Sequence, residues 1–197
     1  MSERPMLFST PMVEAIMADR KTQTRRLVKE IPLDAPYFED VDGVPMACDQ
    51  DGDWWPAVRF SRIQPGDIIW VRETWKQATT GTAGPGLIDL YLYRADEPQD
   101  TTGMMVEDRW HPSIHMPRKA ARIFLRVKEV RLERLHEIMD APPGPDNPIV
   151  KEGCTYGFEF IAIWDNTINP AERSLYGWNA NPWVWVIEFE RIKNGRA

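Results

Sequence analysis

Alternating apolar and polar residues, bounded by prolines and glycines, predict that this chain folds around β-strands. Residues 183–189 are the clearest case. One face of that segment is apolar and the other is acidic and partly solvated (Trp183, Trp185, Ile187 and Phe189 against Glu188 and Glu190). Residues 68–75, after the Gly66-Asp67 turn, and residues 87–94 follow the same rule. Residues 123–135 alternate with a shift of phase between Val127 and Val130, which predicts a bulge or a bend between two strands.

Two helices are expected beside these strands. Thr10 is suited to the N-cap and Pro11 to the first turn, and Met12, Ala15 and Ile16 then recur at helical spacing. A second helical period comes late in the chain, over residues 158–165 (Phe158, Ile161, Ala162 and Asp165). The sequence therefore predicts an α+β fold, a mostly antiparallel and strongly curved sheet or small barrel with one helix early and another late.

The length of 197 residues is suited to one domain spanning residues 1–197. Two segments interrupt the pattern. Residues 32–65 carry Pro32, Pro36, Pro45 and Pro56 among acids and glycines and are expected to form a loop or small hairpin insertion. Residues 140–148 contain Pro142-Pro143-Gly144-Pro145, which predicts a loop without regular structure.

Composition narrows the function classes. The net charge of −6 and pI of about 5.2 argue against indiscriminate binding along a nucleic-acid backbone. Cys48 and Cys154 are too far apart in sequence to suggest a disulfide framework or a zinc pair. The start of the chain lacks a signal-peptide pattern, and the apolar run at residues 183–187 is too short to cross a bilayer. A soluble, cytoplasmic protein without a membrane partner is the expectation.

A basic cluster at residues 20–26 is the best candidate for chemistry (Arg20, Lys21, Thr22, Gln23, Thr24, Arg25 and Arg26). Its cations can hold a phosphate or carboxylate, and they disfavour a further charge on Lys21, which lowers the pKa of that lysine. The alternative is a solvated helix end whose cations interact favourably with the negative end of the helix dipole.

The local conformation decides which of these side chains can act together. In a helix, Lys21 and Thr24 share a face at i,i+3 spacing. In a strand, Thr22, Thr24 and Arg26 share one face and Lys21 points away. A helix-to-strand junction after Lys21 is a third alternative, and it brings Lys21 over Thr24.

Other residues have both functional and structural interpretations. His111 and His115 are four residues apart, but Pro112 and Pro117 argue against the helix that a metal site would need there, so no metal site is predicted. Three cations form either an extension of a basic cleft or a solvated face (Arg118, Lys119 and Arg122). Three tryptophans either stack on a base or belong to the core (Trp70, Trp75 and Trp110).

The residues that carry a family resemblance extend over most of the chain. They are Phe8–Met12, the Lys-Thr-x-Thr-x-Arg motif of the basic cluster, Gly66-Asp67 with Trp70–Trp75, His111–Arg118 and Asn181–Phe189. Together they resemble the ASCH family within the PUA-like fold group, and in particular its phage and prophage branch. For a phage-encoded member the implied location is the host cytoplasm.

The resemblance implies a small curved β-barrel with helices at its rim and a cleft for a nucleoside or single-stranded RNA. Some ASCH proteins are amidohydrolases that remove the acetyl group from the exocyclic amine of acetylcytidine by means of a lysine, a threonine and a glutamate. The lysine and threonine match Lys21 and Thr24. The glutamate, which follows a helix, is best matched by Glu152, with Glu73 as the second candidate. No cofactor is implied.

Five arginines and one threonine are the candidate substrate- or anion-binding residues (Arg20, Thr22, Arg25, Arg26, Arg72 and Arg118). The second interpretation of the chain is a non-catalytic module that binds RNA or a modified nucleotide through the same basic cluster.

Overall fold

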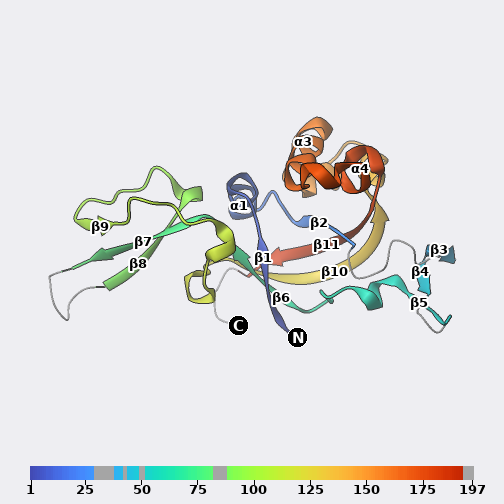
Figure 1. The fold of residues 1–197 in the computed structure, drawn as a ribbon, viewed down its shortest axis with the longest axis horizontal. Coiled ribbons are helices and arrows are strands. Elements are labelled where there is room, and N and C mark those ends of the chain that lie inside the picture. The colour runs from blue at the N-terminus through green and yellow to red at the C-terminus, as the bar shows by residue number, and fades with distance from the viewer. Residues whose placement is uncertain (29–37, 42–43, 49–51, 82–87, 193–197) are drawn as a thin grey trace. The chain divides into compact units, whose positions relative to one another are not determined.

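The fold is described from a computed structural model that covers residues 1–28, 38–41, 44–48, 52–81 and 88–192. It is of the α+β class, with strands in several sheets and few helices (Figure 1). The chain divides into two compact units that alternate along the sequence: residues 1–19, 68–125 and 191–197 form the first, and residues 20–67 and 126–190 form the second. Within the described ranges, no helix is long and apolar enough to cross a membrane.

The first unit contains two groups of strands. β1 (Glu3–Leu7) and β6 (Ile68–Arg72) pair in parallel, with Glu3 opposite Ile68. β7 (Trp75–Thr80) pairs antiparallel with both β8 (Ile88–Tyr93) and β9 (Met104–Val106), in the order β8-β7-β9. The short elements of this unit are α1 (Thr10–Met17) and the 3-10 helices η2 (Arg94–Asp96), η3 (Ser113–His115) and η4 (Arg118–Ala120).

Several predictions for the first unit need correction. The strand expected over residues 68–75 is divided between β6 and β7, because Glu73 turns a buried carboxylate towards Arg122 while the backbone amide of Glu73 contacts Met116. Ser9, not Thr10, is the N-cap residue of α1. β9 lies within residues 95–117, where the sequence shows no alternation that would predict a strand. The predicted start at Leu87 lies outside the described residues, and β8 begins at Ile88.

The second unit is built on β2 (Gln23–Leu27), β10 (Phe124–Arg134) and β11 (Trp183–Arg191), with β11 between the other two. β11 pairs antiparallel with β2, and Ile187 lies opposite Thr24. A separate antiparallel sheet joins β3 (Phe38–Val41), β4 (Val44–Cys48) and β5 (Trp54–Pro56), followed by η1 (Ala57–Phe60). This small sheet and η1 lie within the predicted insertion at residues 32–65. Residues 32–37, 42–43 and 49–51 lie outside the described ranges.

The phase shift in residues 123–135 is present, but the two strands inferred from it are one. β10 runs through the shift without interruption, with Lys128 and Glu129 both exposed between the buried Val127 and Val130. Leu135 begins η5 (Leu135–Met139) instead of continuing the strand. The chain then passes through the proline-rich residues 140–147, which form neither a helix nor a strand, to α2 (Pro148–Lys151).

The core of the second unit joins α3 (Gly157–Thr167) to η5 and β11. The helix predicted over residues 158–165 is confirmed, and its buried side chains differ from those that marked the helical period. Phe160 and Trp164 enter the core with Val184 and Val186, whereas Phe158 is 68% exposed. The rest of this region consists of η6 (Pro170–Glu172), α4 (Arg173–Tyr176) and η7 (Trp178–Ala180), and Figure 1 shows α3 and α4 on the same side of β11.

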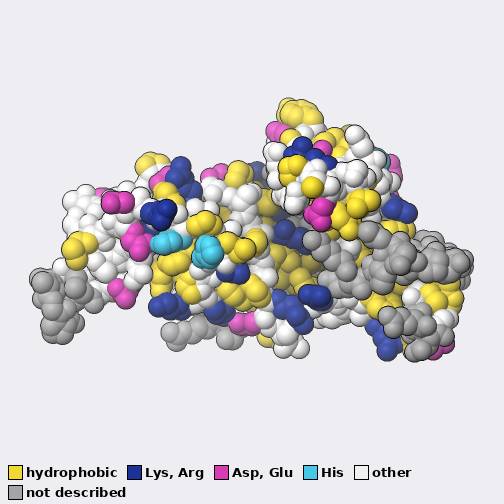
Figure 2. Space-filling view, viewed as in Figure 1, with side chains coloured by type: hydrophobic (Ala, Val, Ile, Leu, Met, Phe, Trp, Pro, Cys, Tyr) yellow, Lys and Arg dark blue, Asp and Glu magenta, His cyan; other side chains and the backbone are white. Residues whose placement is uncertain are grey.

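The described strands form open sheets and no closed barrel, so the barrel remains a prediction of the family resemblance. The surface carries charges of both signs. On the face shown in Figure 2, lysines and arginines occur in several small groups among acids and apolar side chains. That face therefore carries no broad basic surface, as is typical of a chain with a net charge of −6.

Candidate active site

A buried ion pair in the second unit joins Lys21 to Glu152. The Lys21 Nζ atom lies 2.6 Å from Glu152 Oε2 and also donates a 2.9 Å hydrogen bond to the Glu152 backbone oxygen. The two side chains are 0% and 3% exposed. The backbones of the same residues form an antiparallel bridge, so main chain and side chain fix the contact together.

Arg25 completes a buried cluster around the same carboxylate. Its Nη1 atom donates to Glu152 Oε1 at 3.1 Å, and its Nη2 atom donates to Glu133 Oε2 at 2.8 Å. Each oxygen of Glu152 therefore faces a different cation. Because the charges are paired and hydrogen-bonded, the cost of burying them is offset.

The sequence around Glu152 explains how a carboxylate reaches this position. Asn147 caps α2 by accepting a hydrogen bond from the backbone amide of Ile149, and Pro148 occupies the first turn. The helix ends at once, because Gly153 adopts a left-handed conformation with φ of 85°. The amides of Gly153 and Cys154 then bond back to Val150 and Ile149, which is the pattern of a Schellman cap. Glu152 is thus the last residue of a tightly closed turn.

The basic cluster adopts the strand alternative rather than the helical one. α1 ends at Met17, Lys21 is already paired with Glu152, and β2 begins at Gln23. Lys21 and Arg25 both contact Glu152, and Gln23 between them donates to the Pro148 oxygen at 3.0 Å. Strand alternation places Thr24 on the opposite face from these three side chains. Thr24 is itself 2% exposed.

The environment of Lys21 makes its proton easier to remove. Burial lowers the pKa of the ammonium below its ordinary value of 10.5, Glu152 raises it, and the charge of Arg26 lowers it again. Burial also lowers the pKa of the Arg26 guanidinium, against the field of Glu152. Lys21 is therefore a lysine whose proton can be shared with a carboxylate 2.6 Å away.

Half-exposed charges continue the cluster towards solvent. Arg131 pairs with Glu133 and lies 3.5 Å from Glu188, and Lys151 lies 3.8 Å from Glu188. Glu133 thus links the buried Arg25 to side chains that water reaches. The route from Glu152 outwards is a chain of alternating charges, Glu152–Arg25–Glu133–Arg131–Glu188.

Cys154 lies beside the cluster, and its thiol is expected to be unreactive. Burial raises the pKa of the thiol from 9.0 to about 11, and the positive charge of Lys21 opposes part of that rise. At neutral pH the thiolate fraction is then roughly 100-fold below that of an ordinary cysteine, since each pKa unit is a factor of ten. Under native conditions, mass spectrometry after iodoacetamide treatment should show alkylation of Cys48 well before Cys154. Equal rates in native protein would contradict this, and unfolded protein provides the control.

The other residues predicted from the basic cluster stay in this unit but differ in their surroundings. Arg20 is exposed, and its Nη1 atom is 3.4 Å from the Gly153 oxygen. Thr22 donates its amide to the Lys151 oxygen and accepts from Phe189, so its backbone binds two segments together. Arg25, predicted as an anion-binding residue, is already held by the two carboxylates.

Glu73, the second candidate glutamate, belongs to the first unit. There Arg122 donates to both of its oxygens, at 2.9 and 3.0 Å, and also to Asp96. Burial raises the pKa of Glu73, and Arg122 lowers it. Arg72 and Arg118 lie in the same unit: Arg72 donates to the Ile114 oxygen, and Arg118 is paired with Glu3 at 2.8 Å.

Within the described ranges, no three histidine, cysteine, aspartate or glutamate side chains lie close enough together to hold a metal ion. His111 Nε2 lies 2.8 Å from Glu107, and its ring stacks on Trp75. Trp75 is 8% exposed and therefore belongs to the core.

Sequence reasoning placed Gln23 in the basic cluster without giving it a role, and it missed Glu133. Both side chains help to hold the site together. The role of Gln23 could have been found from the alternation Lys21, Gln23, Arg25, because alternate residues of a strand share a face. Glu133 gave no such signal. It sits among the alternating charges of residues 126–134 and is distinguished from them only by its contact with Arg25.

Comparison with known proteins assigns no family to the chain. No family model matches it, and no curated protein matches it. Among solved structures it is similar to the crystal structure of hypothetical protein PH0355, with 14% identity and a TM-score of 0.44 over 98% of this chain and 100% of that one. At that TM-score the likeness supports no conclusion about fold or function.

Proposed function

We propose that this protein is an ASCH-type amidohydrolase that removes an acyl group from the exocyclic amine of a cytidine-like nucleoside. Lys21 and Glu152 are its proton-carrying pair, and Thr24 is the third member that the family resemblance implies. The contact between Lys21 and Glu152 carries the proposal: two residues 131 positions apart, each matched to a catalytic residue of the family, meet at 2.6 Å. A small curved barrel of the PUA-like type is part of the same proposal.

Hydrolysis of the amide consumes one water molecule. The water oxygen bonds to the acyl carbon, the bond from that carbon to the exocyclic nitrogen breaks, and one proton must reach the leaving amine. Glu152 is suited to accept a proton from the attacking water, and Lys21 is suited to donate one to the nitrogen. The lowered pKa of Lys21 favours that donation, because a weaker base gives up its proton more readily.

Thr24 has a less direct role in this scheme. Its place on the opposite face of β2 from Lys21 separates the two side chains that the family would use together. Water is therefore assigned as the nucleophile, and Thr24 is assigned a supporting role through its pairing with Ile187 of β11.

The proposal is tested by following acetylcytidine hydrolysis through the absorbance change on deacetylation. We expect turnover by the unaltered protein and a loss of about 100- to 10,000-fold in Lys21→Met, the usual contribution of a positioned acid or base. Lys151→Met is the matched control, because Lys151 neighbours Glu152 in sequence but is 25% exposed and pairs with Asp146 and Glu188. Circular dichroism and thermal unfolding must show that both variants remain folded.

Two outcomes would remove the proposal. One is equal turnover by Lys21→Met and the unaltered protein. The other is no turnover by folded protein on acetylcytidine or on other N4-acylated cytidines. In that second case, salt-sensitive RNA binding that weakens in Arg20→Ala would establish the binding module instead. The exposed guanidinium of Arg20 is the observation that favours it.

A further inference from the structure

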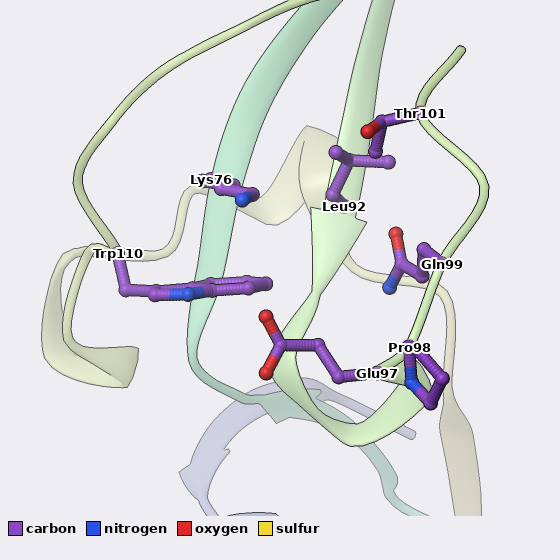
Figure 3. Close-up of a pocket in the computed structure, with 7 residues that line it drawn as sticks. All are labelled: Lys76, Leu92, Glu97, Pro98, Gln99, Thr101 and Trp110. Carbon is purple, nitrogen blue, oxygen red and sulfur yellow. The ribbon is translucent and has the colours of Figure 1, made fainter.

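The first unit contains a cavity of about 450 Å³ whose side chains have no role in the proposed hydrolysis. Cavities of roughly 300–1,000 Å³ are the usual size for small-molecule sites. Lys76 of β7 and Leu92 of β8 line it, as do Glu97, Gln99 and Thr101 from the segment after η2 and Trp110 from the segment after β9. Figure 3 shows Trp110 entering from one side, with Glu97 and Gln99 facing it from the other.

Trp110 gives the cavity an aromatic wall, and two cations lie over its ring. The Lys76 Nζ atom lies 4.5 Å from the centroid of the Trp110 ring, and the Arg94 guanidinium carbon lies 5.5 Å from it. Trp110 is half-buried, and Leu92, which also lines the cavity, is buried. A flat ligand that displaces water from the cavity can therefore contact the indole of Trp110 and the apolar side chain of Leu92.

The cavity lining carries one positive side chain, Lys76, and one negative side chain, Glu97. Glu97 is the acidic member, and it is paired with Arg94 at 3.0 Å. Lys76 has no carboxylate within 4.0 Å among the described residues. One positive charge thus remains without an acidic neighbour at the edge of an aromatic cavity, where a phosphate or carboxylate of a ligand would pair with it.

The far wall offers hydrogen-bond acceptors. Gln99 donates its Nε2 group to the Tyr93 backbone oxygen at 2.6 Å, which leaves its Oε1 atom as an acceptor, and no described residue donates to that atom. The carboxylate of Glu97 provides further acceptor positions beside it. A ligand that satisfies this wall must present hydrogen-bond donors, and the N–H groups on the amino edge of a nucleobase are such donors.

We propose that this cavity is a nucleotide site for a base with an exocyclic amino group. The base lies against Trp110, its amino edge donates to Glu97 and Gln99, and its phosphate pairs with Lys76. The site is distinct from the proposed amidohydrolase centre: it lies in the first unit, uses none of the same side chains, and binds its ligand without changing it. Its occupant is either a free nucleotide or one nucleotide of a single strand.

Calorimetric titration with AMP and IMP tests the site, since the two differ in whether position 6 of the purine carries an amino group or an oxygen. We expect AMP to bind at least tenfold more tightly than IMP, and Trp110→Ala and Lys76→Met to weaken AMP binding at least tenfold. Arg109→Met and Trp54→Ala are the controls, because one removes an exposed cation and the other an exposed tryptophan, both outside the cavity. Both controls should bind AMP as the unaltered protein does.

The two sources of the nucleotide are separated by titrating oligoadenylate against AMP. Tighter binding of the oligomer, beyond the gain from its number of sites, identifies a strand; equal affinity per site identifies a free nucleotide. The proposal is overturned if AMP does not bind at millimolar concentration, if inorganic phosphate binds as well as AMP, or if AMP and IMP bind equally. It is also overturned if the two cavity variants bind as the controls do. Lys21→Met should bind AMP normally, so failure of one site does not imply failure of the other.

Discussion

Replacing Glu152 with glutamine is expected to destabilise the protein by about 3–5 kcal/mol, the usual cost of leaving a buried charge without its partner. The side chains of Lys21 and Arg25 are 0% and 1% exposed, and both contact this carboxylate. The variant therefore leaves two buried cations facing a neutral amide. Lys21→Met should cost less, about 1–3 kcal/mol, since Glu152 keeps its hydrogen bond from Arg25.

The measurement is the free energy of unfolding in urea for both single variants and for the double variant. Because the two side chains interact directly, the double variant should be more stable than the sum of the single losses predicts. Glu188→Gln is the control: Glu188 is 22% exposed and its pairs are 3.5 and 3.8 Å long, so the loss should stay within about 1 kcal/mol. A smaller loss for Glu152→Gln than for Lys21→Met would contradict the arrangement of charges.

Replacing Arg122 with methionine is expected to destabilise the first unit by about 3–5 kcal/mol at neutral pH, by the same argument. The side chain of Glu73 is 2% exposed, and Arg122 donates to both of its oxygens. Without Arg122 the carboxylate is buried unpaired. Arg118→Met is the control, because Arg118 forms an exposed pair with Glu3 and its loss should leave stability close to that of the unaltered protein.

The loss of unfolding free energy in Arg122→Met should become smaller as the pH is lowered. Burial already raises the pKa of Glu73 above its ordinary value of 4.5, and Arg122 is the group that lowers it. In the variant the pKa of Glu73 therefore rises further, and this carboxylate binds a proton more tightly in the folded state than in the unfolded state. Stability from that proton is fully present below pH 4.5 and is lost as the pH rises through the folded-state pKa. Unfolding curves at acidic and neutral pH test this, and a loss that is independent of pH would contradict it.

Local patterns predicted the longest strands and the two longer helices because the causes of these elements are local. The helix after Ser9 begins where a proline is suited to the first turn, and the strand at residues 183–191 follows from its alternating residues. The errors have long-range causes. The strand over residues 68–75 breaks because Glu73 forms an ion pair with Arg122, 49 residues away. Helix α3 buries Phe160 instead of Phe158 because η5 and β11 pack against the face that carries Phe160.

The candidate site was predicted in part. The basic cluster named Lys21, Thr24 and Arg25, and the family resemblance named Glu152, but no pattern in the chain indicates that Lys21 and Glu152 touch. Their contact depends on the closed turn from Asn147 to Gly153 and on the pairing of β2 with β11. Thr24 shows the limit of motif reasoning, because strand geometry separates it from the lysine three residues before it.

The sequence by itself determined the α+β class, the positions of the longest strands and of the two longer helices, and a cluster of cations in an acidic chain. Periodicity, capping residues and composition act over a few residues, so they can be read without a fold. Only the tertiary structure decided which charges lose water and which partners compensate them. That outcome depends on residues more than 100 positions apart, and it makes Lys21, Arg25 and Glu152 a buried cluster while Arg20 stays in solvent.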